Sequence, residues 1–394
     1  DQQYKLLRKS DREIAVTVPV IMDDGSLRLM DGYRIQHNAG LGPFHGPLRI
    51  DGDLKITELR ALAAWMTWKC ALLGIPFGGA AGGVVVDRQT LSASELERVV
   101  RRWTANMLGD IGPDRDVLAP EFADDADLMA WALDTMAGHT DGAANSAVTG
   151  KPHEMGGSAC HEDAVAAGLR IILRVAASHY GLGPKGGLSV VIQGAGVVGG
   201  NLARILHSEG HRVVGLSDVH TALYNPDGLD IPALLAHREE HSRLPELNEG
   251  GTTVVPEEDF LKLPCDVLAP CAISMAVHSR NAEFIQARMI VEGAHGPVSP
   301  RADAILERRG IPVVPDILAN GGSVVVSYFE WIQNRTGYAW IEEVVAGRLR
   351  RYMREAWDAV RTTQEQYDCS LRAATHILAV KRVAEADAAR GVYA

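Results

Sequence analysis

The sequence predicts a two-domain α/β protein whose second domain has a Rossmann-type fold, and three observations support this. The chain has 394 residues, more than a single hydrophobic core usually holds. Residues 188–218 read as an apolar strand, a glycine-rich turn, a helix and a second strand, which is the pattern of a dinucleotide-binding βαβ unit. Long amphipathic segments at 342–368 and 370–390 close the chain, and we expect them to pack back across both domains.

Residues 1–150 mix strand and helix signals, so we expect an α/β domain there. Residues 14–21 are rich in Val and Ile and predict a strand, followed by a turn at 23–25. Ser92 and Glu95 have the spacing of a capping box, and the helix that they start carries apolar residues on one face. A helix before residue 74 leads into a glycine run at 78–83, which indicates bare backbone close to a neighbouring element.

Residues 155–330 alternate helix and strand, which implies a parallel sheet. A helix at 164–180 leads into a strand at 188–193, and a helix after the glycine turn ends at Gly210 before the strand at 213–218. Short apolar strands follow at 265–269, 289–292 and 311–314. We therefore place the domains at 1–150 and 155–330, with 342–394 packing back onto the first.

The turn after the strand at 188–193 has the spacing of a dinucleotide fingerprint. Gly194 permits the tight turn, Gly196 lets a pyrophosphate approach the backbone, and Gly199 permits close packing of helix on strand. The start of the following helix offers free amides to phosphate. Asp218, at the end of the next strand, is placed to accept bonds from ribose hydroxyls, so the sequence favours NAD and leaves NADP possible.

Composition excludes several classes of partner. The net charge of −11 argues against nucleic acid, which requires a basic surface. No apolar run reaches 18 residues and the first residues show no signal-peptide core, so we expect neither a membrane span nor secretion. The five cysteines form no CxxC pair, and a reducing cytoplasm is the expected compartment.

Seven motifs in order along nearly the whole chain resemble those of glutamate dehydrogenases, which interconvert glutamate and 2-oxoglutarate with a nicotinamide cofactor. They lie at residues 32–38, 66–69, 76–80, 148–152, 225–230, 315–322 and 326–331. The resemblance implies an N-terminal domain for substrate binding and assembly, a Rossmann domain, a cleft between them and a homo-oligomer, usually a hexamer.

Several site residues carry over from the family. The resemblance implies that Lys69 holds the substrate α-carboxylate, that Ser327 helps to bind the side-chain carboxylate, and that Met66 is another substrate contact. A lysine there supplies a point charge for a carboxylate. Asn320, in the motif at 315–322, is expected to contact the cofactor.

Three catalytic positions depart from the family. Ala81 stands where the glycine-rich motif Gly-Gly-Ala-Lys-Gly-Gly carries the lysine that polarises the reacting carbonyl or water. Glu121 replaces the proton-shuttling aspartate, and its extra methylene is enough to misplace a proton transfer. His45 replaces the lysine for the distal carboxylate, and a neutral imidazole binds that group poorly.

Positions next to the cofactor change as well. Val165 aligns with the threonine that bonds the nicotinamide amide, and Val197 aligns with an asparagine inside the glycine fingerprint. His295 replaces another family asparagine. We expect no metal site, because His45, His161 and His295 are far apart and no carboxylate is spaced to join them on one helix.

These departures leave three interpretations open, and whether the chain is an enzyme depends on them. The first is a diverged dehydrogenase or imine reductase that acts on the CH–NH₂ or C=N group of an amino or imino acid without a distal carboxylate, with His45 or Glu121 moving protons. The second is a repurposed, non-redox enzyme on an amino or keto acid. The third is an inactive paralogue that binds a metabolite or assembles with an active partner subunit.

Overall fold

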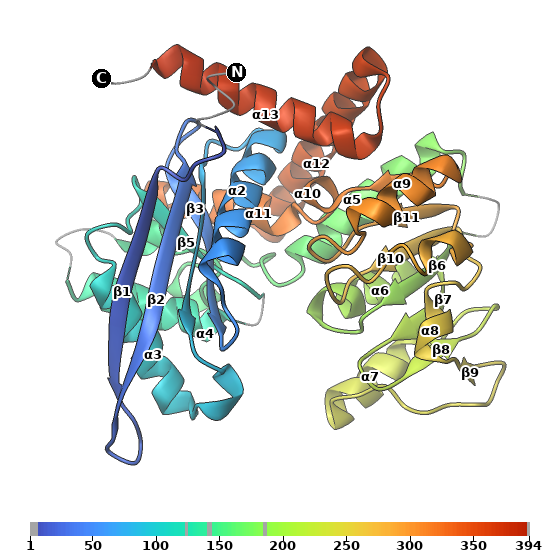
Figure 1. The fold of residues 1–394 in the computed structure, drawn as a ribbon. Coiled ribbons are helices and arrows are strands. Elements are labelled where there is room, and N and C mark those ends of the chain that lie inside the picture. Colours follow the sequence, from blue (N-terminus) through green and yellow to red (C-terminus); the bar gives the residue numbers. More distant parts are fainter. Residues whose placement is uncertain (1–6, 123–124, 140–143, 184–186, 392–394) are drawn as a thin grey trace. The chain divides into compact units, whose positions relative to one another are not determined.

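A computed structural model describes residues 7–122, 125–139, 144–183 and 187–391. It divides the chain into two compact units, and each is described by itself. Unit 1 comprises residues 1–162, 324–348 and 378–394, and unit 2 comprises residues 163–323 and 349–377. Unit 1 thus includes 155–162 and 324–330, which the predicted limits place in the second domain, and unit 2 includes 349–377, which lies in the segment expected to pack onto the first. Both units are α/β, as predicted (Figure 1).

Unit 1 is built on a mixed five-stranded sheet in the order β1-β2-β4-β3-β5. The strands are β1 (Arg12–Ile21), β2 (Leu27–Asn38), β3 (Phe44–Asp51), β4 (Gly79–Val85) and β5 (Asp116–Pro120). The predicted strand at 14–21 is therefore confirmed as β1. The glycine run is itself the strand β4, which pairs antiparallel with β2 and parallel with β3.

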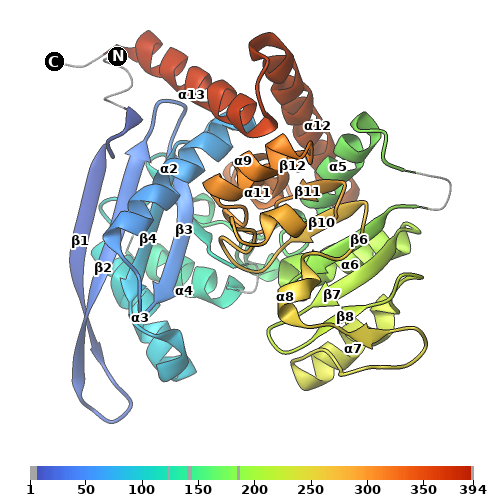
Figure 2. The ribbon, with the colours of Figure 1, turned by 45° about the vertical axis from the view of Figure 1, so that its right-hand side comes forward.

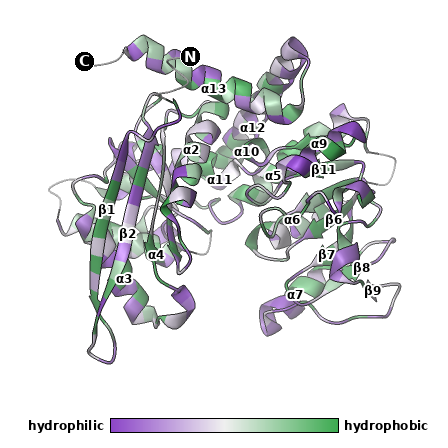
Figure 3. Cartoon of the chain, viewed as in Figure 1, coloured by the Kyte–Doolittle hydropathy of each residue, from purple (hydrophilic) through white to green (hydrophobic). Residues whose placement is uncertain are grey.

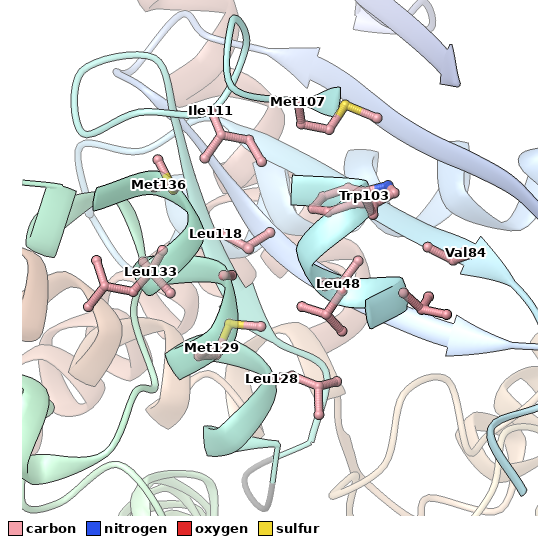
Figure 4. Packing of buried hydrophobic residues seen from close by; sticks show 14 of the residues in the cluster. Leu48, Val84, Trp103, Met107, Ile111, Leu118, Leu128, Met129, Leu133 and Met136 are labelled. Carbon is pink, nitrogen blue, oxygen red and sulfur yellow. The ribbon is translucent and has the colours of Figure 1, made fainter. Parts of the chain in front are cut away.

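Helices cover both faces of this sheet. Helix α2 (Ile56–Leu72) packs on one face, and its core includes Leu59, Ala63 and Ala81. Helices α3 (Ala93–Asn106) and α4 (Ala126–Ala137) pack on the other face around the buried Trp103 (Figure 4). The predicted capping box at the start of α3 is confirmed in full. Helix α11 (Gly322–Thr336) contributes residues from Val324 onward to unit 1.

Helix α2 lies unusually close to β4 because β4 lacks side chains. A Cβ atom on Gly79 would lie 2.2 Å from the backbone nitrogen of Thr67 and 2.4 Å from the carbonyl oxygen of Ala63. Real Cβ atoms do not approach backbone this closely, so the packing of α2 on β4 requires glycine at this position. The close approach expected from the glycine run is confirmed.

Unit 2 is built on a seven-stranded sheet in the order β12-β11-β10-β6-β7-β8-β9. The parallel strands are β6 (Ser189–Gln193), β7 (Arg212–Ser217), β10 (Val267–Pro270), β11 (Met289–Val291) and β12 (Val313–Val314). β8 (Ala222–Tyr224) and β9 (Thr253–Val254) add an antiparallel edge that the sequence analysis missed. They are two or three residues long, too short to show a period.

The two faces of this sheet carry different helices (Figure 2). Helices α5 (Ala164–His179) and α6 (Val197–Ser208) pack together, and Ile192 of β6 faces α6. Val191 points to the opposite face, because side chains alternate along a strand, and packs in a core with helices α8 (Glu257–Phe260) and α9 (Pro300–Arg308). Helices α7 (Ile231–His241) and α10 (Asp316–Ala319) complete this unit.

Two long helices end the chain, as predicted, and each supplies residues to both units. They are α12 (Glu342–Tyr367) and α13 (Leu371–Arg390), and their faces alternate between polar and apolar character (Figure 3). In unit 2, Arg372 of α13 binds Glu292 and Asp303. In unit 1, Arg382 of α13 donates to the carbonyl groups of Ala71 and Leu72 at the end of α2, both at 2.8 Å.

We expect Gly79→Ala to destabilise unit 1, because the new methyl group collides with the backbone of α2. Overpacking of this kind costs about 1–3 kcal/mol, or more where backbone must move. Thermal unfolding should show a fall of several degrees in the midpoint. Gly109→Ala is the matched control, since a Cβ there meets nothing within 4 Å. Equal midpoints for the two variants would contradict the close packing.

Candidate substrate and dinucleotide sites

The predicted substrate residues all lie in unit 1, on four different elements. Lys69 and Met66 are on α2, Ser327 is on α11, His45 is on β3 and Ala81 is on β4. Lys69 is buried, with 3% of its surface exposed, and Ser327 is 2% exposed. Lys69 lies two residues from Thr67 and Ala81 two residues from Gly79, so the contact of α2 with β4 fixes both.

Ala81 lies in apolar surroundings. It is fully buried and packs with Ile35, Leu54, Leu59 and Ala63. These neighbours offer a cationic side chain no acidic partner, and burial without one strongly disfavours an ammonium group. In this chain the side chain of Ala81 is therefore part of the hydrophobic core of unit 1.

Glu121 follows β5, and its carboxylate is held by an ion pair. Its Oε1 lies 2.5 Å from a guanidinium nitrogen of Arg49 on β3, and its side chain is 6% exposed. Arg49 also binds Glu58 at 2.9 Å. The Glu121 carboxylate is therefore paired with the guanidinium group of Arg49, which Glu58 also holds in place.

His45 is a neutral, stacked imidazole. Burial lowers its pKa from 6.5 to about 4, and the nearby Arg34 guanidinium also favours the neutral form. Its Nδ1 lies 3.1 Å from the carbonyl oxygen of Val117. Its ring stacks on Phe77 with centroids 4.8 Å apart. Phe77 also packs edge-on against Trp331 of α11, at 5.3 Å.

Phe77 and Trp331 lie in the motifs at 76–80 and 326–331, but no role was predicted for their rings. A buried ion pair was also not predicted: Lys151 Nζ lies 2.7 Å from Glu330 Oε1, and both side chains are inaccessible to solvent. Burial lowers the pKa of Lys151, and the attraction of Glu330 opposes that shift. His161 lies 3.8 Å from the same carboxylate. Sequence spacing gives no sign of these pairs because the partners lie about 180 residues apart.

The dinucleotide residues lie in unit 2. Gly194 has φ of +94°, and its amide donates to the carbonyl of Ser217 on β7 at 2.9 Å. A Cβ on Gly199 would lie 1.9 Å from the carbonyl oxygen of Gly194, so α6 packs directly on the turn. Gly196 is the N-cap of α6, and a Cβ there would meet nothing within 4 Å. The start of α6 therefore has free space beside Gly196 and is closely packed against the turn at Gly199.

Two further residues of unit 2, Asp218 and Asn320, carry free hydrogen-bond acceptor capacity. The Asp218 carboxylate accepts from the amides of Thr221 at 2.7 Å, His220 at 2.8 Å and Leu244 at 2.5 Å. A carboxylate has about four acceptor positions, so one remains for a ligand hydroxyl. Asn320 donates to the carbonyls of Gly293 and Ala294, while its buried Oδ1 has no hydrogen-bond partner.

Val165 and Val197, which the family resemblance places beside the cofactor, lie at the starts of two helices of unit 2. Val197 is the first residue of α6 and Val165 the second of α5, and both are half-buried. His295 is exposed on the loop after β11. Within the described residues, no three His, Cys, Asp or Glu side chains gather as a metal site requires. None of the helices in that part of the chain is long and apolar enough to cross a membrane.

A buried lysine on one unit and a glycine turn at the head of a parallel sheet on the other are the features of a two-domain, dinucleotide-dependent oxidoreductase fold. The family model described as "Glu/Leu/Phe/Val dehydrogenase, dimerisation domain" matches residues 10–138. The model described as "Glutamate/Leucine/Phenylalanine/Valine dehydrogenase" matches residues 156–391. The chain therefore belongs to the Glu/Leu/Phe/Val dehydrogenase family, as the resemblance implied.

Individual relatives agree. The glutamate dehydrogenase of Thermotoga maritima is 42% identical over 99% of this chain and 93% of its own length. The catabolic NAD-specific glutamate dehydrogenase of Bacillus subtilis is 39% identical over 98% of this chain and 91% of its own length. The leucine-bound hetero-hexameric glutamate dehydrogenase of Thermus thermophilus superimposes with a TM-score of 0.95 at 38% identity, covering 100% of this chain and 93% of that one.

The low pKa of His45 predicts a pH dependence of stability. The unfolded chain binds a proton at this residue near pH 6.5, and the folded chain only near pH 4. The free energy of unfolding therefore falls as pH decreases through this window, by about 3 kcal/mol at most. Denaturant unfolding measures the free energy of unfolding at pH 7 and at pH 4.5, and the difference between the two should be smaller for His45→Gln than for the parent chain.

His207→Gln is the control, because His207 lies on the exposed face of α6. It should show the same pH difference as the parent, and an equal reduction in both variants would contradict the role of His45.

Proposed function

We propose that this chain is an amino-acid-binding subunit of the glutamate dehydrogenase type that turns over glutamate poorly by itself and works with a catalytically complete subunit in a mixed oligomer. Ala81 is the observation that carries this proposal. A fully buried methyl group in an apolar cluster stands where the family motif has its lysine.

The lost lysine has a large expected cost. Removal of the group that stabilises a developing oxyanion lowers rates by about 10²–10³, and removal of a positioned acid or base costs about 10²–10⁴. Glu121 is a poor substitute for a mobile proton carrier, because an ion pair with Arg49 fixes the position of its carboxylate. The two positions together predict very slow oxidation of glutamate.

The pocket that remains favours an amino acid with an apolar side chain. Lys69 supplies a cation for the α-carboxylate, as the family resemblance implies. A glutamate side chain needs a second cation, and the neutral His45 does not provide one. The buried ring of Phe77 packs against the rings of His45 and Trp331, and we propose that this ring cluster favours an apolar side chain. Ser327 of α11 and Met66 of α2 are the other predicted substrate contacts.

Unit 2 fits a nicotinamide dinucleotide. The open N-cap at Gly196 suits a pyrophosphate, the remaining acceptor on Asp218 suits a ribose hydroxyl, and the unpartnered Oδ1 of Asn320 suits an amide donor. Such a cofactor supplies a hydride acceptor when bound. An acidic Asp218 disfavours a 2′-phosphate, and similar chains from Bacillus subtilis and Staphylococcus aureus are named NAD-specific, so we propose NAD.

Mixed assembly is supported by two comparisons. Residues 10–138 match a dimerisation domain, so the chain comes from a family of oligomers. The Thermus thermophilus assembly is hetero-hexameric and carries leucine, which is an amino acid with an apolar side chain. A subunit without the lysine can be retained in such an assembly because partner subunits perform the chemistry.

A second candidate function rests on the intact dinucleotide residues. The chain would then be an oxidoreductase on an apolar amino or imino acid, with Glu121 or His45 moving the proton. The retention of Gly194, Gly196 and Gly199 in their expected geometry favours it. NAD reduction with leucine by the purified chain alone, at a rate near that of a complete family member, would support this candidate over the first.

We expect purified chain to reduce NAD with glutamate at least 10²-fold more slowly than the Thermotoga maritima enzyme. Ala81→Lys with Glu121→Asp should restore part of the rate if only the chemistry was lost. If glutamate is turned over only when His45→Lys is added to these two changes, the substrate site is specific for a side chain other than that of glutamate. A rate in the parent chain comparable to that of the Thermotoga maritima enzyme would contradict the proposal.

Gly196→Asp should abolish NADH binding and leave the fold intact. Aspartate is a favourable N-cap residue, and its Cβ meets nothing, but its carboxylate occupies the pyrophosphate position and repels it. Titration calorimetry with NADH measures the loss. Gly347→Asp is the control, since it adds the same side chain at an open position of α12. Failure of the parent chain to bind NADH would refute the cofactor assignment.

A further inference from the structure

Unit 2 carries an open pocket, with a volume of about 690 Å³, that the proposed function does not use. Its lining residues come from helix α5 and from the part of helix α12 that belongs to unit 2. Both helices are labelled in Figures 1 and 2. Its walls include four arginines: Arg170 and Arg174 from α5, and Arg350 and Arg354 from α12. We call it the arginine pocket.

The positive charge of this pocket is only partly neutralised. Arg170 donates from Nε to Glu209 at 2.7 Å, and Arg174 lies 3.7 Å from the same carboxylate oxygen. The other oxygen of Glu209 is buried and has no hydrogen-bond partner. Within the part of the chain that the structure describes, Arg350 and Arg354 form no ion pair. With Asp358 as the acid in the pocket wall, four cations face two anions.

The arginines of this pocket repel one another, and the overall charge of the chain gives no reason for them to gather there. Each helix presents its two arginines four residues apart, where like charges repel each other. The chain as a whole is acidic, with 50 acidic and 39 basic residues. Four arginines around one pocket therefore stand out against the charge of the protein, and an anion between them would relieve the repulsion.

The remaining walls suit a small ligand. Trp357 of α12 lies in the wall, and the ring of His179 packs edge-on against it at 6.0 Å. Burial lowers the pKa of His179, and the nearby Arg361 acts in the same direction. The volume falls in the usual range of small-molecule sites. Guanidinium groups bind phosphate oxygens through two parallel hydrogen bonds.

We propose that the arginine pocket binds a small phosphate-type anion that carries at least two negative charges. This site is separate from the dinucleotide turn. Gly196 is the N-cap of the 12-residue helix α6, and Glu209, which binds the α5 arginines, is its C-cap. The two ends of such a helix lie about 20 Å apart.

Pyrophosphate is the probe, because it is the smallest anion of this class. Titration calorimetry is carried out on the full chain with Gly196→Asp, so that the glycine turn does not contribute. We expect pyrophosphate to bind at 0.1 M sodium chloride, and to bind more tightly than orthophosphate at equal ionic strength.

Arg350→Gln with Arg354→Gln should weaken pyrophosphate binding at least tenfold. Neither arginine has an ion pair in the described chain, so the thermal midpoint should stay within two degrees of the parent. Arg351→Gln is the matched control, because Arg351 is exposed on the same helix, one residue from Arg350, and does not line the pocket. It should change the affinity less than twofold.

Two results would overturn the proposal. One is heat no greater than that of sodium chloride at the same ionic strength, in which case the arginines serve another partner such as an acidic protein segment. The other is an equal loss in Arg351→Gln and in the double variant, which would indicate attraction to the whole helix. Neither result bears on amino-acid binding in unit 1, so this test is independent of the proposed function.

Discussion

The contact of helix α2 with strand β4 is the constraint on which the substrate residues depend. Gly79 lets the backbone of α2 approach so closely that no side chain fits between them. This contact fixes the position of Lys69, which lies two residues after Thr67 on α2. It also fixes Ala81, which lies two residues after Gly79 on the same face of β4. The packing of α2 on the glycine strand is therefore present, and the proposed function rests on Ala81 at the position where the family motif is expected to carry a lysine.

The other predicted catalytic positions are also held by their neighbours. Arg49 fixes the carboxylate of Glu121. Burial lowers the pKa of His45 and favours its neutral form, and its ring stacks on Phe77. In unit 2 the glycine turn retains its geometry beside the apolar Val165 and Val197. These features are the basis of the proposal that the chain binds an amino acid and a dinucleotide in a mixed assembly and converts glutamate poorly by itself.

Local patterns predicted most of the fold, because strands, caps and amphipathic helices depend on near neighbours in sequence. The strand β1, the capping box of α3 and the turn at Gly194 were all evident from their spacing. The antiparallel edge β8-β9 was not, since strands this short show no period. Ion pairs between distant segments, such as Arg49 with Glu121 or Arg170 with Glu209, could not be predicted. The local sequence pattern does not indicate which charged residues come together in the fold.

The preference of the pocket for an apolar side chain is the central claim, and calorimetric titration of the parent chain with L-leucine and L-glutamate tests it most directly. The account predicts that leucine binds at least tenfold more tightly than glutamate, and that Lys69→Gln weakens leucine binding by a similar factor because the α-carboxylate loses its cation. Tighter binding of glutamate, or leucine binding that does not depend on Lys69, would contradict it.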